Sequence, residues 1–361
     1  MSATRHRPAD HPPVPEARIG VLLANLGTPS GTGYRPMRRY LSEFLSDPRV
    51  IDYSPWFWQP LLQLVILAKR PFTSGAAYRR IWNYERDESP LMTVTREQTE
   101  KLRARLRRHD PEILVEFAMR YGEPAIPDVL RRMVEAGCRR LLFVPLYPQY
   151  AAPTTASACD RLFEATRELK WVPAIRVVPP WYDDPGYIEV LARSIREHLA
   201  GLDFEPDLLI FSYHGEPKRF LHEGDPYHCH CAKTTRLVRE RLGLPEERTL
   251  MCFQSRFGSE EWLQPYLDET LKELPARGIR RVAVVSPAFV ADCLETLEEL
   301  AIANRELFLE AGGEHYAYIP CLNAREDHMA FLEGLVLREL AGWLEPARAA
   351  EPSPAAAEAT R

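Results

Sequence analysis

The sequence lacks several features that would assign it to common protein classes. It has no apolar, uncharged run of about eighteen residues, so no transmembrane helix is predicted. Residues 1–18 are polar and proline-rich, without the apolar segment of a secretory signal, and predict a disordered tail. GxGxxG, GxxxxGK[ST] and GxSxG are all absent, so neither a nucleotide cofactor nor a serine nucleophile of the elbow type is predicted.

Charge and cysteine content narrow the partners and the compartment. The formal net charge of −5 argues against nucleic acid as the main partner. Seven cysteines without a secretory signal favour a reducing, cytoplasmic location. The 361 residues, 45% of them hydrophobic, are enough for a large core, and the length favours two domains.

Short apolar runs alternate with helical patterns along the chain in two successive series. The first series predicts strands at residues 19–25, 113–119, 140–146 and 175–178, and the second at 208–211, 250–254, 282–285 and 316–319. Such alternation predicts parallel sheets. We therefore expect an α/β protein of two similar Rossmann-like lobes, each a four-stranded parallel sheet flanked by helices, with a ligand cleft between them.

The same reading divides the chain into segments. We expect an N-terminal lobe at 19–180, a C-terminal lobe at 181–325, a helix at 326–345 that packs back, and a loose tail at 346–361. An insertion near residues 50–72 interrupts the first lobe, and it is apolar on nearly all sides. Such a helix is either covered by protein or in contact with a membrane or a large apolar ligand, and the sequence leaves both alternatives open.

Two strand ends of the second series carry groups suited to chemistry. His214 follows an apolar strand, where the carboxyl ends of parallel strands face the ligand crevice. After a later strand come Asp292, Glu295 and Glu299. Asp292 and Glu295 also fit a capping pattern at a helix start, and His214 also fits a hydrogen-bonded histidine at a strand end. If the strand ends converge, the imidazole and carboxylates suit binding a divalent metal or moving protons.

Eight motifs in order along residues 19–344 resemble those of the ferrochelatase family. They are LLANLGTP, YLSEFLSDPRVID, SPL, PLYPQY, SYHGEP, GDPYHCHC, FQSRFGSEEWLQPYLDETL and DCLETLEEL. The resemblance implies a lyase that inserts Fe(II), its substrate, into protoporphyrin IX without ATP, giving protohaem as the terminal step of haem biosynthesis. The alternatives are a chelatase for another tetrapyrrole or divalent metal, and a non-catalytic porphyrin or haem carrier.

The resemblance also implies residue roles. SYHG places the catalytic histidine at His214 and DCLET the catalytic carboxylate at Glu295, both at the metal, with Glu299 on the delivery side. Porphyrin contacts are implied at Leu26, Arg70, Ser89, Arg120, Tyr121, Tyr150 and Trp262. The apolar stretch at 53–67 resembles the family's pocket lip, which suggests peripheral contact with the inner membrane. Cys293 stands where some relatives carry histidine, so a second imidazole there is absent.

The cysteine-rich stretch 222–231 raises the question of an iron–sulfur cluster, which some family members carry. Candidate ligands of a [2Fe-2S] cluster are Cys159, His222, Cys229 and Cys231. A cluster usually takes four cysteines, and only two lie together here, so the pattern favours free thiols in a solvated loop.

Overall fold

Two parallel sheets dominate the computed structural model, which describes residue 8 and residues 10–344. Each sheet has four strands, in the orders β2-β1-β3-β4 and β6-β5-β7-β8. The expected α/β architecture of two similar units is confirmed. The strands are β1 (Arg18–Gly27), β2 (Leu114–Tyr121), β3 (Cys138–Pro145), β4 (Ala174–Val177), β5 (Leu208–His214), β6 (Thr249–Gln254), β7 (Arg281–Val285) and β8 (His315–Ile319).

The register of the second sheet explains where His214 lies. The apolar run predicts that the strand ends at residue 211, but β5 continues as Ser212, Tyr213 and His214 pair with Cys252, Phe253 and Gln254 of β6. β7 pairs with β5 only as far as Phe211. His214 is therefore the last residue of a central strand, at the carboxyl edge of the sheet.

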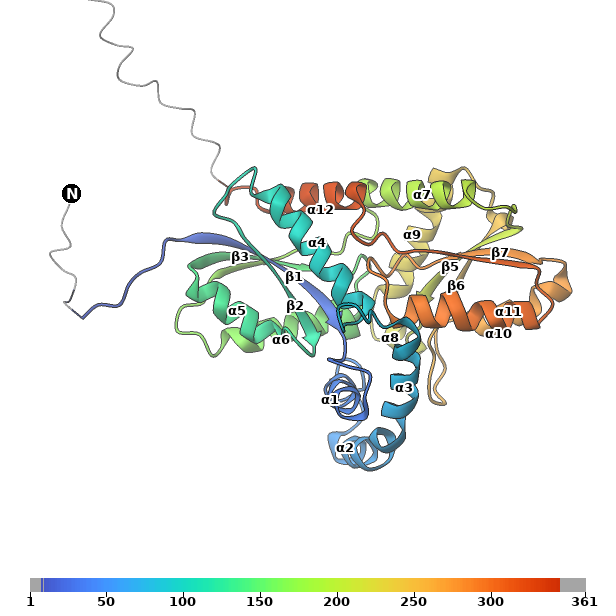
Figure 1. Ribbon diagram of the computed structural model, residues 1–361, viewed down its shortest axis with the longest axis horizontal. Coiled ribbons are helices and arrows are strands. Elements are labelled where there is room, and N and C mark those ends of the chain that lie inside the picture. The colour runs from blue at the N-terminus through green and yellow to red at the C-terminus, as the bar shows by residue number, and fades with distance from the viewer. Residues whose placement is uncertain (1–7, 9, 345–361) are drawn as a thin grey trace, which may run out of the picture.

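Helices surround both sheets (Figure 1). The first half contains α1 (Tyr34–Leu45), α2 (Pro55–Leu61), α3 (Leu67–Ile81), α4 (Pro90–Leu106), α5 (Ile126–Glu135) and α6 (Ser157–Thr166). The second contains α7 (Pro185–Ala200), α8 (Lys218–His222), α9 (Tyr227–Leu242), α10 (Leu267–Glu273), α11 (Asn304–Glu310) and α12 (Glu326–Glu339). Single-turn 3₁₀ segments lie at η3 (Glu246–Arg248) and η4 (Pro275–Arg277), and π-helical segments at η1 (Leu62–Ile66), η2 (Ala152–Ala156) and η5 (Glu295–Ala303).

One hydrophobic core joins the two lobes. A single cluster of buried side chains includes Val21 and Leu23 of β1 together with Leu209 and Phe211 of β5. The C-terminal helix α12 packs against α4 of the first half and α7 of the second, and Met329 in it is fully buried. Because apolar burial is shared in this way, the relative position of the two sheets is set by packing.

Helices α1, α2 and α3, together with η1, form a projecting hairpin on the side of the molecule away from α7 and α12 (Figure 1). The apolar insertion expected near residues 50–72 forms α2, η1 and the start of α3 in this hairpin. Trp58 is buried and its Nε1 donates to the carbonyl of Leu45 at 2.6 Å. In contrast, Trp56 is 93% exposed, and Phe57 and Leu64 are exposed as well. One face of the insertion therefore packs on protein while another presents large apolar side chains to solvent. Among the described residues, no helix is long and apolar enough to span a bilayer.

The expected tails lie mostly beyond the residues that the structure describes. Residues 345–361, which include the expected tail 346–361, and residues 1–7 and 9 fall outside them. Residues 11–17 precede β1 without regular structure, and β1 begins at Arg18, within the stretch expected to be a tail.

Candidate active site

A cavity of about 680 Å3 lies between the two lobes. Its wall takes residues from the end of β1, from the projecting hairpin, from the loop after β5 and from η5. All three π-helical segments contribute, through Ile66, Thr154 and Glu295. Because π-helical turns shift the facing of side chains and occur often at functional sites, their gathering here marks the cavity as the candidate site.

His214 faces this cavity half-buried, and its tautomer follows from one hydrogen bond. Its Nδ1 lies 2.7 Å from the carbonyl oxygen of Gly215. Because a carbonyl oxygen can only accept, Nδ1 carries the proton. In the neutral imidazole Nε2 then keeps its lone pair, so the residue can accept a proton or contact a metal through Nε2.

Glu295 and Glu299 line the same cavity from η5. Hydrogen bonds in a π-helix run from residue i to i+5, so residues four apart remain near one another on the same side. Asp292 is not the simple helix cap that the alternative reading of the sequence describes. Its carboxylate accepts hydrogen bonds from Tyr318 and Asn323, both at 2.6 Å, and Glu295 is left facing the cavity.

Glu299 is held in one orientation by the end of β6. The backbone N–H of Ser255 donates to its Oε1 at 2.9 Å, and the Ser255 hydroxyl donates to its Oε2. Gln254 Nε2 also reaches Oε2, at 3.3 Å. Burial raises the pKa of Glu299, while the Ser255 hydrogen bond and the nearby His214 pull it down. The imidazole and this carboxylate therefore interact electrostatically inside the cavity.

Other ionisable groups in the cavity wall were not singled out by the sequence. Burial, with a smaller contribution from Asp225, raises the pKa of Glu216 well above its usual value. Burial likewise raises the pKa of Tyr40, with contributions from Tyr78 and Glu295. The sequence signal for Glu216 was its position two residues after His214, because it lies in the loop that directly follows β5.

The residues expected to contact porphyrin divide into two groups. Leu26, Arg70 and Trp262 line the cavity. Burial lowers the pKa of Arg70, whose guanidinium lies 5.6 Å from the centre of the Phe257 ring. Ser89, Arg120, Tyr121 and Tyr150 are not part of this wall.

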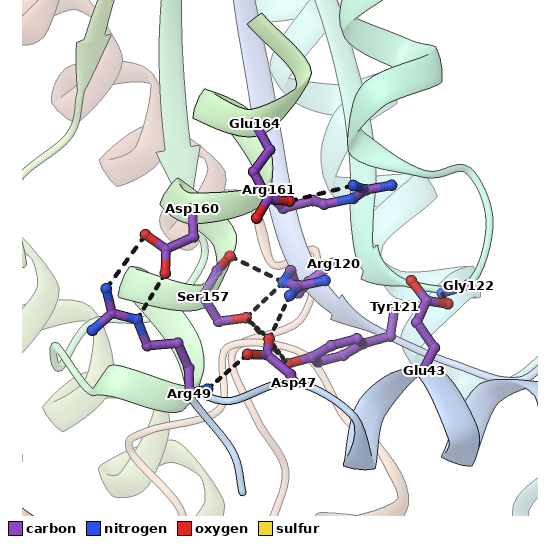
Figure 2. A network of polar contacts seen from close by, with 10 residues as sticks. All are labelled: Glu43, Asp47, Arg49, Arg120, Tyr121, Gly122, Ser157, Asp160, Arg161 and Glu164. Atoms are coloured by element: carbon purple, nitrogen blue, oxygen red, sulfur yellow. Dashed lines mark hydrogen bonds and ion pairs between the residues drawn. The ribbon is translucent and has the colours of Figure 1, made fainter. Parts of the chain in front are cut away.

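Figure 2 shows why Arg120 and Tyr121 lie elsewhere: both converge on the carboxylate of Asp47. The Tyr121 hydroxyl donates to it at 2.7 Å, Ser157 donates at 2.5 Å, and Arg120 forms an ion pair with it. Tyr121 is fully buried, and its ring packs edge-on at 5.0 Å against Phe44, which does line the cavity. This network supports the cavity wall from behind.

Ser89 and Tyr150 also make structural contacts. The Ser89 hydroxyl accepts a hydrogen bond from the Met92 N–H at 3.2 Å and so caps α4. The backbone N–H of Tyr150 donates to His230 Nδ1 at 3.1 Å.

The four candidate cluster ligands are not gathered into a site. Cys159 lies on α6, His222 at the end of α8, and Cys229 and Cys231 on α9. Cys229 is exposed whereas Cys231 is buried. Burial raises the pKa of Cys159 to about 11, and it also raises the pKa of Cys231 well above its usual value. Within residue 8 and residues 10–344, no three His, Cys, Asp or Glu side chains are grouped as metal ligands.

Several residues of the cavity wall carry buried polar atoms without a partner in the part of the chain that the structure describes. Tyr147 Oη, Gln149 Oε1 and Trp262 Nε1 have no hydrogen-bond partner among the described residues. Because a buried polar group without a partner is costly, each of these atoms favours an ordered water beside it.

The fold is of the type seen in solved chelatases. The structure is similar to SirB from Bacillus subtilis solved with Fe3+, with a TM-score of 0.52 and 15% identity over 71% of this chain and 93% of that one. It is also similar to the sirohydrochlorin chelatase SirB from Bacillus subtilis subspecies spizizenii in complex with cobalt, with a TM-score of 0.52 and 12% identity over 90% and 97%. At such identities the likeness concerns the fold.

Sequence similarity is much closer to one family. The ferrochelatase family model matches residues 18–340, so the chain belongs to the ferrochelatase family. It is 57% identical to a ferrochelatase of Rhodobacter capsulatus over 94% of this chain and 97% of that one. It is 55% identical to one of Agrobacterium fabrum, over 93% and 98%.

Proposed function

We propose that this protein inserts Fe(II) into protoporphyrin IX to form protohaem, and is in that sense a lyase. The observation that carries the proposal is that His214, Glu295 and Glu299 line one largely apolar cavity in a chain of the ferrochelatase family. Iron enters the reaction as a substrate and leaves in the product.

His214 acts as the proton acceptor in this proposal. Inserting a divalent metal into a free-base porphyrin releases the two pyrrole N–H protons. With Nδ1 fixed on the Gly215 carbonyl, the free lone pair of Nε2 accepts one pyrrole proton and passes it to solvent water, after which it accepts the second. The imidazolium that forms is stabilised by the neighbouring Glu299 carboxylate, with which His214 interacts.

Glu295 and Glu299 form the metal side of the site. Carboxylate oxygens suit ferrous iron, which must exchange water for protein oxygens before it reaches the pyrrole nitrogens. Glu295 stands in the first turn of η5, and Ser255 fixes the Glu299 carboxylate one turn further. The two residues therefore offer successive oxygen donors along one side of the cavity.

The wall of the cavity supplies porphyrin binding. Leu26, Trp262 and other apolar or aromatic side chains cover a macrocycle, and Arg70 offers a guanidinium to a propionate carboxylate. Part of this binding energy is used to distort the ring, because a distorted pyrrole exposes its lone pair to the metal.

The exposed face of the hairpin gives the protein a membrane contact in this proposal. Trp56, Phe57 and Leu64 expose large apolar surfaces close to the cavity-lining residues Ile66 and Arg70. An apolar surface of this kind, next to the site of an apolar substrate, suits peripheral contact with a bilayer. Porphyrin or haem then passes between membrane and cavity with little exposure to water.

The function is tested by anaerobic incubation of the purified protein with ferrous iron and protoporphyrin, followed by the appearance of the haem spectrum. His214→Ala should abolish metalation and leave porphyrin binding, measured by fluorescence, within about threefold of the parent value, about 0.7 kcal/mol. Glu295→Gln should lower turnover at least about a hundredfold, the lower end of what one positioned catalytic group contributes.

Each alternative function predicts a different result. A carrier would bind porphyrin without metalation in the parent protein, and a different chelatase would prefer cobalt, nickel or another tetrapyrrole. Normal turnover by the His214 variant would refute the proposed mechanism, and an unchanged rate for Glu295→Gln would remove that carboxylate from it.

A further inference from the structure

Residues 255–262, which we call the strap, follow β6 directly and end at Trp262. Most of the strap lines the cavity, including Ser255, Phe257 and Glu260. It begins at Ser255, whose φ of 66° is unusual for a residue other than glycine. That conformation directs both the N–H and the hydroxyl of Ser255 to the carboxylate of Glu299. The position of the strap is thus linked directly to the orientation of Glu299.

Arg219 ties the strap to the first lobe. It lies on α8, which follows the short loop after His214, and its Nε donates to Glu260 of the strap at 2.6 Å. Its two terminal nitrogens form a bidentate ion pair with Asp52, which lies between α1 and α2 in the projecting hairpin of the first lobe. All three residues line the cavity and are only partly exposed, at 32% for Arg219, 29% for Glu260 and 38% for Asp52.

A neighbouring ion pair lacks this link between the lobes. Lys218, adjacent to Arg219 on α8, binds Glu261 of the strap at 2.8 Å. Both residues belong to the second half of the chain, and neither lines the cavity. The chain therefore contains a matched pair of contacts between α8 and the strap, of which the one through Arg219 reaches Asp52.

We propose that Arg219 is a positioning residue for metal insertion: bound to Asp52 and Glu260, it holds the strap against the first lobe and thereby keeps Glu299 aligned with the cavity. This rests on the proposed metal side of the site. A planar bidentate guanidinium suits the task, because it can bind two carboxylates in fixed directions. The macrocycle enters or leaves when the tie opens, and the tie closes again over bound porphyrin.

The test is single-turnover metalation of pre-bound protoporphyrin, in Arg219→Gln, Asp52→Asn and the double variant, with Lys218→Gln as control. We expect the insertion rate to fall about fivefold in each single variant, which corresponds to about 1 kcal/mol. The double variant should be no slower than the single ones, because both remove the same tie. Half-saturation by ferrous iron should shift upward, whereas porphyrin affinity measured by fluorescence should stay within about twofold, less than about 0.5 kcal/mol.

The possible results distinguish failure of the role proposed for Arg219 from failure of the proposed function. Failure of the parent protein to metalate would refute the proposed function. If the parent metalates, two results would overturn the role of Arg219. One is that Arg219→Gln and Asp52→Asn insert iron at the parent rate, and the other is that the Lys218→Gln control is as slow as they are. If Arg219→Gln folds poorly in urea unfolding, Asp52→Asn and Glu260→Gln decide the matter, because each removes one carboxylate partner and leaves α8 unchanged.

Discussion

Replacing Tyr121 by Phe tests whether the network around Asp47 supports the cavity wall or contacts substrate. The substitution removes one hydroxyl and keeps the buried ring against Phe44. The lost hydrogen bonds are those to the Asp47 carboxylate at 2.7 Å and to Ser157 at 3.1 Å. A hydrogen bond to a charged group contributes about 1.5–3 kcal/mol, so we expect the free energy of unfolding to fall by that amount.

The pH dependence of this loss follows from Asp47. Burial alone would raise the pKa of Asp47, but hydrogen bonds from Ser157 and Tyr121 and the charge of Arg120 lower it below its usual value. A carboxyl group with a lowered pKa in the folded state stabilises the protein above its unfolded pKa of about 3.9, and this contribution is lost as the pH falls through the folded pKa. The difference between parent and variant should therefore be constant from about pH 5 to 8 and shrink below about pH 4.

Urea unfolding followed by tryptophan fluorescence measures the effect. The matched control is Tyr84→Phe, because the Tyr84 hydroxyl donates to a backbone carbonyl at 3.1 Å on an exposed surface. That control should change stability by less than about 0.5 kcal/mol. If Tyr121→Phe is as stable as the parent, or if it is stable but raises the KM for porphyrin severalfold, the supporting role assigned to Tyr121 is wrong.

Two further predictions concern the backbone and the surface. Gly27 has a φ of 111°, and a Cβ there would lie 1.8 Å from the Tyr121 carbonyl oxygen, so Gly27→Ala should destabilise the protein by more than about 3 kcal/mol in urea unfolding. Gly334 lies in α12 with open space around it, so Gly334→Ala should stabilise the protein by about 0.5–1 kcal/mol. If Gly27→Ala and Gly334→Ala change the free energy of unfolding equally, the close contact described at Gly27 is wrong. Changing Trp56 or Phe57 to Ser should weaken cosedimentation with phospholipid vesicles about tenfold, since each apolar ring buried in the interface contributes at least about 1.5 kcal/mol. The control is Trp171→Ser, because Trp171 is also an exposed tryptophan but lies outside the hairpin. Unchanged vesicle binding by the Trp56 and Phe57 variants would argue against the hairpin as the membrane contact.

Much of the fold could be predicted from periodicity. The apolar runs that predict strands coincide with β1 to β8 to within a few residues, because buried parallel strands are continuous apolar segments bounded by turns. The end of β5 was placed too early, since Ser212, Tyr213 and His214 lack the apolar pattern and pair with β6 nonetheless. Pairing with a neighbouring strand depends on backbone hydrogen bonds, and the hydropathy of the side chains does not reveal these bonds.

The site could be predicted only in part. His214 and Glu295 were predicted because each follows a strand of one sheet and because their motifs resemble those of a family, and both line the cavity. The ties of Arg219 to Asp52 and of Ser255 to Glu299 join positions far apart in the chain, and no local pattern signals them. The same holds for Arg120 and Tyr121, whose motif resembles a substrate contact but whose side chains converge on Asp47.

By itself the sequence determined the class of fold, the family and the strand-end positions of His214 and Glu295, because hydropathy and motifs are local properties of the chain. The tertiary structure alone decided which side chains share a cavity and which stand behind its wall. It also decided which nitrogen of His214 can accept a proton. One hydrogen bond to the Gly215 carbonyl fixes the proton on Nδ1, and the lone pair of Nε2 remains available. Such choices depend on distances between residues remote in sequence, and only packing sets those distances.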